Sequence, residues 1–309
     1  MRKIILLISL FLVYPIPDQA QEKVVIKFLY SFGGEGIDPG FLNNPMGISI
    51  DPQGNIYIAD TGNNRIQKLD AYGQVINFIG GFGWDSEQFQ KPVDIWANNG
   101  LDVFVADYEN RRIERYDKDL NWISSLYSDS RLPEELHFGF PCGIANSIHG
   151  ELFLTDDENY RVLKFSTERI PILNFGGFDW GEGKLEKPCK ILVTKDDKVY
   201  VTDLSAGCIV EYDYYGNFLM RWGESVLSQP SGICKTLTGH LVITDKGTDQ
   251  IVVFDRTGRV ICQWGSGGDK LGAFKNPADV ACFADKLFVV DSGNHRVQVF
   301  SLTIYKNEK

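Results

Sequence analysis

The chain repeats one short pattern six times, and this repetition limits the folds open to it. ADTGNNRIQKLD (59–70) returns as VDSGNHRVQVFS (290–301), and related copies begin at Ala106, Thr155, Thr202 and Thr244. A second marker precedes each copy: a proline, a small or polar residue, and then an aliphatic residue, as in PMGI and PVDI. The marker prolines are Pro45, Pro92, Pro141, Pro188, Pro230 and Pro277, spaced 42 to 49 residues apart. Six copies at this period indicate an array of similar supersecondary units.

Within one unit the apolar residues follow a period of two. NIYIAD, RIQKLD and VINFIG are apolar or alternating, and the turn-forming stretches DPQGN, TGNN and AYGQ bound them. This pattern predicts four short strands per unit, and no segment after residue 20 sustains a helical period. We therefore expect an all-β fold, a six-bladed β-propeller of four-stranded antiparallel blades.

The two ends of the repeat region predict how the ring closes. The last unit has three strong strands, and only the tail 302–309 follows them. The segment from Lys23 to Pro45 matches the end of a blade, so we expect the N-terminal strand to complete the last blade and remove two open sheet edges. The predicted propeller covers residues 23–301.

The N-terminus is typical of a secretory signal peptide over residues 1–20. Arg2 and Lys3 precede an apolar run from Ile4 to Val13, which is too short to span a bilayer as a helix. The sequence leaves open whether this segment is cleaved or retained as an anchor. It predicts a secreted or periplasmic protein without a transmembrane span in the mature chain. The net charge of −10 disfavours binding to nucleic acid.

The spacing Pro-x-[GD]-[IV], followed by an Asp-ended strand and N-x-R-[IV], resembles the NHL repeat from about Lys23 to Ser301. This resemblance implies a propeller, but propellers serve as enzymes and as binding platforms alike. Two copies depart from the pattern, because Gly207-Cys208 and Asp249-Gln250 stand where the others carry Asn, any residue, and Arg. The RNA-binding NHL ubiquitin ligases are a weaker comparison, since the export signal and the acidic charge argue against RNA.

Each repeat carries an aspartate at the end of its second strand, and four repeats carry an arginine at the start of the third. An aspartate there can accept hydrogen bonds from the following turn and pair with the arginine. Because every blade needs such a turn, we interpret these residues as structural rather than as a metal site. They are Asp60, Asp107, Asp156, Asp203, Asp245 and Asp291, with Arg65, Arg112, Arg161 and Arg296.

The strand order places the long, variable connections between blades on one face, here called the loop-rich face. Short hairpin turns such as DPQGN form the opposite, hairpin face. Variable loops on a rigid scaffold usually carry binding function. We therefore expect a protein, peptide or glycan ligand on the loop-rich face, with Trp84, Trp180, Phe138 and Phe140 as candidate binding residues.

The residues after the marker prolines should surround the mouth of the central channel. The fold also resembles the peptidyl-hydroxyglycine amidating lyase, in which histidines at such positions hold zinc. None of the six positions here is His, and the four histidines fall in different parts of the repeat, so we expect no zinc site and no cofactor. The sequence also lacks GxSxG, HExxH, P-loop and EF-hand patterns. The alternative function is a lyase or hydrolase with a channel-mouth metal held by Asp94, Asp279 and backbone carbonyls.

All six cysteines lie after residue 141, and six cysteines allow 15 complete pairings. Cys142 and Cys189 occupy equivalent positions in neighbouring units, so they are candidates for a disulfide or for a soft metal ion. For most of the cysteines the alternative is a small buried apolar side chain. Neither the pairing nor the oligomeric state follows from the sequence.

Overall fold

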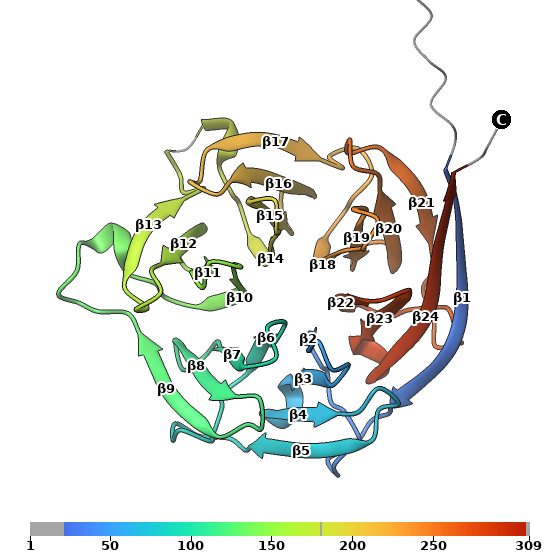
Figure 1. Cartoon of the computed structure of the whole chain (residues 1–309), viewed down its shortest axis with the longest axis horizontal. Helices are drawn as coiled ribbons and strands as arrows, with labels where there is room; N and C mark the ends of the chain where they lie inside the picture. Colours follow the sequence, from blue (N-terminus) through green and yellow to red (C-terminus); the bar gives the residue numbers. More distant parts are fainter. Residues whose placement is uncertain (1–21, 180, 307–309) are drawn as a thin grey trace, which may run out of the picture.

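The computed structural model describes residues 22–179 and 181–306. Figure 1 shows six sheets arranged as a ring around a central axis, and each sheet contains four antiparallel strands. The prediction of an all-β, six-bladed propeller is confirmed. The predicted signal segment and Trp180 lie outside the described residues.

The blades follow the chain, and each runs from an inner to an outer strand. Blade 1 contains β2 (Gly47–Ile50), β3 (Ile56–Asp60), β4 (Arg65–Leu69) and β5 (Val75–Gly80). Blade 2 contains β6 (Pro92–Trp96), β7 (Asp102–Asp107), β8 (Arg112–Asp117) and β9 (Trp122–Tyr127). Blade 3 contains β10 (Pro141–Asn146), β11 (Leu152–Asp156), β12 (Arg161–Phe165) and β13 (Pro171–Phe175).

The second half of the ring repeats this order. Blade 4 contains β14 (Pro188–Val193), β15 (Lys198–Asp203), β16 (Cys208–Asp213) and β17 (Phe218–Trp222). Blade 5 contains β18 (Pro230–Lys235), β19 (Leu241–Asp245), β20 (Gln250–Phe254) and β21 (Val260–Trp264). Blade 6 contains β22 (Pro277–Phe283), β23 (Lys286–Asp291), β24 (Arg296–Lys306) and the N-terminal strand β1 (Glu22–Gly33).

Helical structure in the described part of the chain is limited to short 3₁₀ turns in the loops. These turns are η1 (Thr61–Asn63), η2 (Glu134–Leu136), η3 (Gly181–Gly183) and η4 (Ser292–Asn294). Within residues 22–179 and 181–306, none of the helical segments has the length and apolar character of a membrane span.

The ring closes as the sequence predicts. β1 pairs with β24 in antiparallel register from Glu22 opposite Lys306 to Gly33 opposite Arg296, and the two strands lie side by side in Figure 1. The propeller is longer than predicted, because β24 continues to Lys306 and takes up most of the expected tail. The added residues lengthen the seam that joins the two chain ends.

The hydrophobic core is divided among the seams between blades. Six buried clusters each join one blade to its neighbour. In β3, Ile56 and Ile58 pack toward blade 6, whereas Tyr57 and Ala59 pack toward blade 2. Side chains alternate between the two faces of a strand, and a neighbouring blade covers each face here. The middle strands are therefore buried on both sides, which leaves function to the loops and the channel.

Candidate functional site

The six repeat aspartates anchor the connections that form the loop-rich face. Each carboxylate is fully buried and accepts a backbone N–H from the second residue before the marker proline of its own blade. Burial raises the pKa of Asp107 and of Asp156, although hydrogen bonds to each carboxylate oppose the shift. The donated amides are those of Asn43, Gln90, Gly139, Glu186, Ser228 and Lys275.

The repeat arginines hold the same connections from the other side. The Nε atoms of Arg65, Arg112 and Arg296 lie 2.6, 2.8 and 2.8 Å from the aspartates of their own blades. The Arg112 guanidinium also donates to the carbonyl oxygens of Trp84, Asp85 and Gln88, at 2.7 to 3.0 Å. These contacts explain why the aspartates and arginines recur: they anchor the loops, and this role requires no ligand.

Exposed apolar side chains project from the anchored connections. Trp84 is 68% exposed, Phe82 67%, Phe178 81% and Ile37 78%. Sequence reasoning selected Trp84 but missed the other three. A signal was present, since Phe82 and Phe178 occupy the same position, ten residues before a marker proline.

The two other aromatic candidates do not project freely into solvent. Phe138 is buried and packs against Phe165, so it is not exposed as Trp84 is, although it belongs to the lining of a cavity on the loop-rich face. The connection turns inward there to fill the seam between blades 2 and 3. Phe140 is half-buried and stacks on Tyr108, with the two ring centroids 4.9 Å apart. The Arg111 guanidinium lies 4.2 Å from the centroid of the Phe140 ring. The Phe140 ring therefore has an aromatic and a cationic neighbour.

A cavity of about 490 Å³ lies on the loop-rich face where blades 2 and 3 meet. The lining is polar and includes Asn110, Tyr127, Ser130, His137 and Arg161. Arg161 differs from the other repeat arginines, because its Nε atom is 4.0 Å from Asp156. The connection of this blade, residues 128–140, contains η2 and is longer than the connection of blade 2, residues 81–91.

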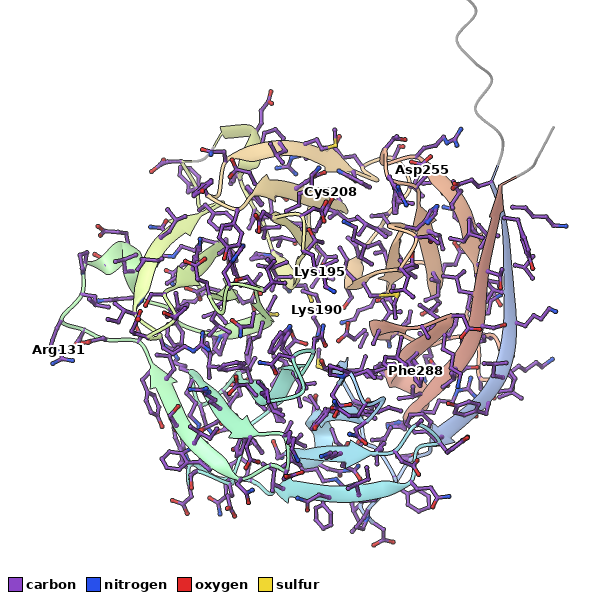
Figure 2. The ribbon with its side chains drawn as sticks, in the orientation of Figure 1. Arg131, Lys190, Lys195, Cys208, Asp255 and Phe288 are labelled. Carbon is purple, nitrogen blue, oxygen red and sulfur yellow. A yellow bond between two sulfur atoms is a disulfide. The ribbon has the colours of Figure 1, made fainter. Side chains whose placement is uncertain are left out.

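A buried charge cluster crosses the central channel. The Lys190 ammonium pairs with Asp94 and lies 3.1 Å from the Asp279 carboxylate, so three different blades meet at this point. Figure 2 shows Lys190 near the centre of the ring. The structure thus brings Asp94 and Asp279 together, as the metal-site alternative required. It also reveals Lys190, which sequence reasoning missed.

The second residue after each marker proline explains how the cluster fits. These positions read Gly47, Asp94, Gly143, Lys190, Gly232 and Asp279 around the ring, so glycine alternates with a charged residue. A Cβ atom at Gly47 would lie 2.9 Å from the Asp94 Cα, and one at Gly143 or Gly232 would come closer still to the next blade. The glycines make room for the charged neighbours. This alternation was visible in the sequence and could have identified Lys190.

The electrostatics of the cluster are dominated by burial and by the opposite charges. Burial raises the pKa of Asp94 to about 6, and the nearby Asp279 acts in the same direction, while Lys190 opposes the rise. Burial alone would lower the pKa of Lys190, but the two carboxylates outweigh it and the net shift is upward. Lys190 is therefore a stable cation between the two aspartates.

The channel on the hairpin side of this cluster widens into a cavity of about 500 Å³. Aliphatic residues of the inner strands, including Ile48, Ile144 and Ile233, line it together with the charged floor. Among the described residues, no group of three or more His, Cys, Asp or Glu side chains is placed to hold a metal ion.

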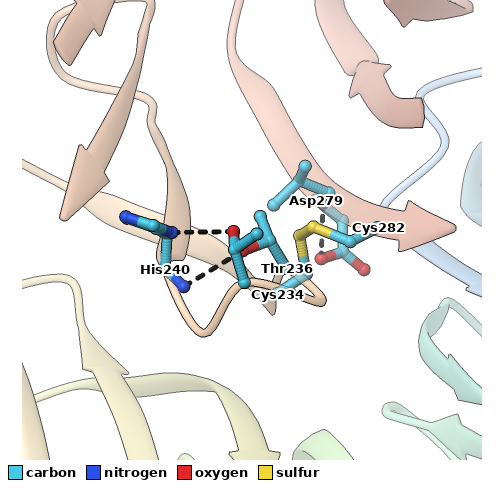
Figure 3. Close-up of a disulfide and its surroundings, with 7 residues drawn as sticks. Cys234, Thr236, His240, Asp279 and Cys282 are labelled. Atoms are coloured by element: carbon cyan, nitrogen blue, oxygen red, sulfur yellow. Dashed lines mark hydrogen bonds between the residues drawn. A yellow bond between two sulfur atoms is a disulfide. The ribbon is translucent and has the colours of Figure 1, made fainter. Parts of the chain in front are cut away.

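The disulfide joins two cysteines other than the candidate pair Cys142 and Cys189. Cys234 of β18 and Cys282 of β22 are joined, with Cα atoms 5.9 Å apart, and Figure 3 shows this bond beside Asp279. Cys142 and Cys189 are free thiols, so this candidate pair does not form a disulfide. A hydrogen bond between these two thiols raises the pKa of Cys142 and lowers that of Cys189. Equivalent positions in the repeat bring them close without joining them.

The geometry defines a class of protein: a closed propeller with anchored connections on one face and a charged floor in its channel. Residues 42–69 and 274–300 match the NHL repeat, and these are the first and last copies of the pattern. The chain is thus a six-bladed β-propeller, and two of its six repeats match the NHL repeat. No curated protein matches the sequence.

Solved structures with the same architecture include enzymes. Virginiamycin B lyase from Staphylococcus aureus is 14% identical with a TM-score of 0.61, and the match covers 91% of this chain and 100% of that one. A gluconolactonase from Xanthomonas campestris is 12% identical with a TM-score of 0.64, over 91% and 98%. A Bacteroides thetaiotaomicron protein of unknown function is 13% identical with a TM-score of 0.69, over 91% and 76%. At these identities the likeness shows the fold alone.

Proposed function

We propose that this chain is an exported, non-enzymatic scaffold that binds a partner protein or peptide on its loop-rich face. The basic and apolar N-terminal segment supports export. A ring closed by the pairing of β1 with β24 supports the role of a rigid scaffold, because this pairing holds the two ends of the propeller together.

The observation that carries the proposal is the rigid presentation of Phe82 and Trp84. Asn110 donates to the Gly83 carbonyl oxygen at 2.9 Å, and Arg112 binds the carbonyl oxygen of Trp84 itself. The backbone is therefore held while both side chains remain about two-thirds exposed. Exposed aromatic residues on a preorganised backbone are typical of binding hot spots, since little conformational entropy is lost when a partner docks.

The alternative function, a metal-dependent lyase or hydrolase, has less support from the charged residues in the channel. The Lys190 ammonium lies between Asp94 and Asp279, where that alternative would place the metal ion. The ammonium therefore occupies the place between the two carboxylates that a metal ion would need. The channel cluster therefore supports a structural role in joining blades 2, 4 and 6.

Site-specific photo-crosslinking tests the scaffold. A benzophenone amino acid at Phe178 should capture a partner in the native host, and mass spectrometry then identifies that partner. With the purified partner, we expect Trp84→Ala combined with Phe82→Ala to weaken affinity by about tenfold or more. Tyr215→Ala is the matched control, because Tyr215 is 73% exposed on the hairpin face. Unchanged affinity in the double variant, with a loss in the control, would contradict binding on the loop-rich face.

A further inference from the structure

The cavity on the hairpin side of the channel, here called the channel cavity, has largely aliphatic walls. Its volume of about 500 Å³ is within the range of sites that hold small organic molecules. The half-buried Trp96 adds an aromatic ring to the lining. An apolar molecule would leave water on entering, which favours its binding. The inner strand of every blade contributes an aliphatic side chain to the walls, including Ile48, Ile95, Ile144, Ile191, Ile233 and Val280.

The charged groups on the floor of the channel cavity already have partners within the protein. The Lys190 ammonium donates to the carbonyl oxygen of Val93 at 3.1 Å and to the carboxylate of Asp94. It also lies 3.1 Å from the Asp279 carboxylate. The backbone N–H of Ile144 donates to Asp94 at 2.8 Å. An apolar group can therefore reach the floor without leaving a buried polar atom unpaired.

The charges of the channel cavity differ between its floor and its mouth. At pH 7 the floor carries one lysine and two aspartates, and thus a net negative charge. At the mouth, the hairpin turns of blades 4 and 5 supply Lys195, Lys235 and Asp196, and thus a net positive charge. Lys235 is bound to Asp196 at 2.8 Å, which leaves the exposed Lys195 for a ligand. A negative group is therefore repelled by the floor and attracted to the mouth.

Further cations extend this positive mouth toward the seam between blades 4 and 5. A second cavity of about 260 Å³ shares part of its lining with the channel cavity and adds Lys198 and Arg256. Lys198 pairs with the buried Glu211, whereas Arg256 donates to the neutral carbonyl oxygen of Thr238 at 2.8 Å. The charge of Arg256 therefore adds to that of Lys195. Positive charge is concentrated here although the chain as a whole has a net charge of −10.

We propose that the channel cavity binds a small amphipathic anion, in which an apolar body ends in a carboxylate, sulfate or phosphate group. The apolar body lies between the aliphatic walls, and the anionic group stays at the mouth beside Lys195, which Figure 2 shows near the centre of the ring. Leu237 also lines the cavity and is 88% exposed, so the ligand would cover apolar surface there. This site lies on the hairpin face and is independent of the proposed partner site on the loop-rich face.

Isothermal titration calorimetry with octanoate, octan-1-ol and octylamine tests the site, because these probes share one alkyl chain and differ in charge. Val193→Trp fills the cavity from a half-buried position of its lining, and Val260→Trp is the matched control on the outer strand β21. Lys195→Glu reverses the charge at the mouth. Lys118→Glu does the same in a hairpin turn outside the cavity. Thermal unfolding of each variant verifies that the propeller is intact.

We expect octanoate to bind more tightly than octan-1-ol, and octylamine to bind most weakly. Val193→Trp should weaken the binding of octanoate and of octan-1-ol by about tenfold or more, because the apolar body loses its space. Lys195→Glu should weaken octanoate by about fivefold and leave octan-1-ol within about twofold, because only the charged probe meets the mouth electrostatically. Val260→Trp and Lys118→Glu should bind all three probes like the unmodified chain.

Equal affinity for octanoate and octylamine would overturn the anionic class of the ligand. Unchanged octanoate binding in Val193→Trp would overturn its location in the channel, and failure of every probe to bind would overturn the site itself. Vesicles of phosphatidylglycerol and phosphatidylcholine separate a free amphiphile from a membrane surface. Binding of the vesicles without binding of octanoate would contradict the proposal. These outcomes leave the scaffold test unaffected, since Phe82 and Trp84 lie on the opposite face.

Discussion

The Arg221 guanidinium lies 3.2 Å from the Sγ atom of Cys208, in the blade where Cys208 replaces the repeat arginine. Arg221 belongs to the outer strand β17, and it donates to the carbonyl oxygens of Glu182 at 3.0 Å and Lys184 at 2.6 Å. These carbonyls belong to the connection that the missing arginine would have held. Blade 4 therefore keeps the anchoring interaction although it has lost the repeat residue.

Arg221→Ala is expected to lower the free energy of unfolding by about 1–3 kcal/mol, because two loop carbonyls lose their charged donor. Chemical denaturation measures the change. Arg131→Ala is the control, since the Arg131 side chain is 88% exposed and pairs only with nearby Asp129. Adding Cys208→Arg to Arg221→Ala should recover part of the loss. A neutral Arg221→Ala would show that the connection needs no donor.

Asp94 is expected to make stability depend on pH in the acidic range. Its folded pKa of about 6 lies above the ordinary value of 3.8, so between these values the folded chain holds a proton that the unfolded chain has released. The contribution is therefore fully present below about pH 4 and is lost as the pH rises through 6, by up to about 3 kcal/mol. Comparing Asp94→Asn with the unmodified chain from pH 4 to 7 isolates this slope. Asp85→Asn, at an exposed side chain, should not alter it.

Gly232→Ala is expected to destabilise the fold by about 1–3 kcal/mol, because the added methyl group would overlap the backbone of Asp279 in the next blade. The backbone of an inner strand cannot move without disturbing the seam. Gly267→Ala is the control, since the nearest atom there belongs to the Asp249 side chain, 3.1 Å away. Thermal unfolding of both variants provides the comparison. Equal midpoints would show that the channel does not need its alternating glycines.

Reduction of the Cys234–Cys282 disulfide is expected to lower stability by about 2–4 kcal/mol, because the bond closes a loop with a sequence separation of 48. Urea denaturation with and without reductant measures the difference. Cys282→Ser should be as stable as the reduced chain and should no longer respond to reductant. Cys262→Ser should behave like the unmodified chain, since Cys262 forms no disulfide. A response to reductant in Cys282→Ser would place the bond elsewhere.

The sequence could locate the connections of the candidate site, but it could not show which side chains in those connections are exposed. Trp84 was selected because its loop is long and aromatic, and the structure leaves it exposed. Phe138 belongs to a similar loop but turns into the core, since the path of that connection depends on the seam it covers. Asn110 is the ordinary asparagine of its repeat. Its Oδ1 atom is buried without a hydrogen-bond partner, which the repeat pattern does not show.

The amino-acid sequence alone determined the number of blades, the four strands in each and the closure of the last blade by the N-terminal strand. Those features follow from local periodicity and turn-forming residues, which recur in every repeat. Only the tertiary structure decided that Lys190 crosses the channel to Asp94 and that Cys234, rather than Cys142, forms a disulfide. Such contacts join residues tens of positions apart. They depend on the distance and direction of side chains across the ring, which equivalence within the repeat does not specify.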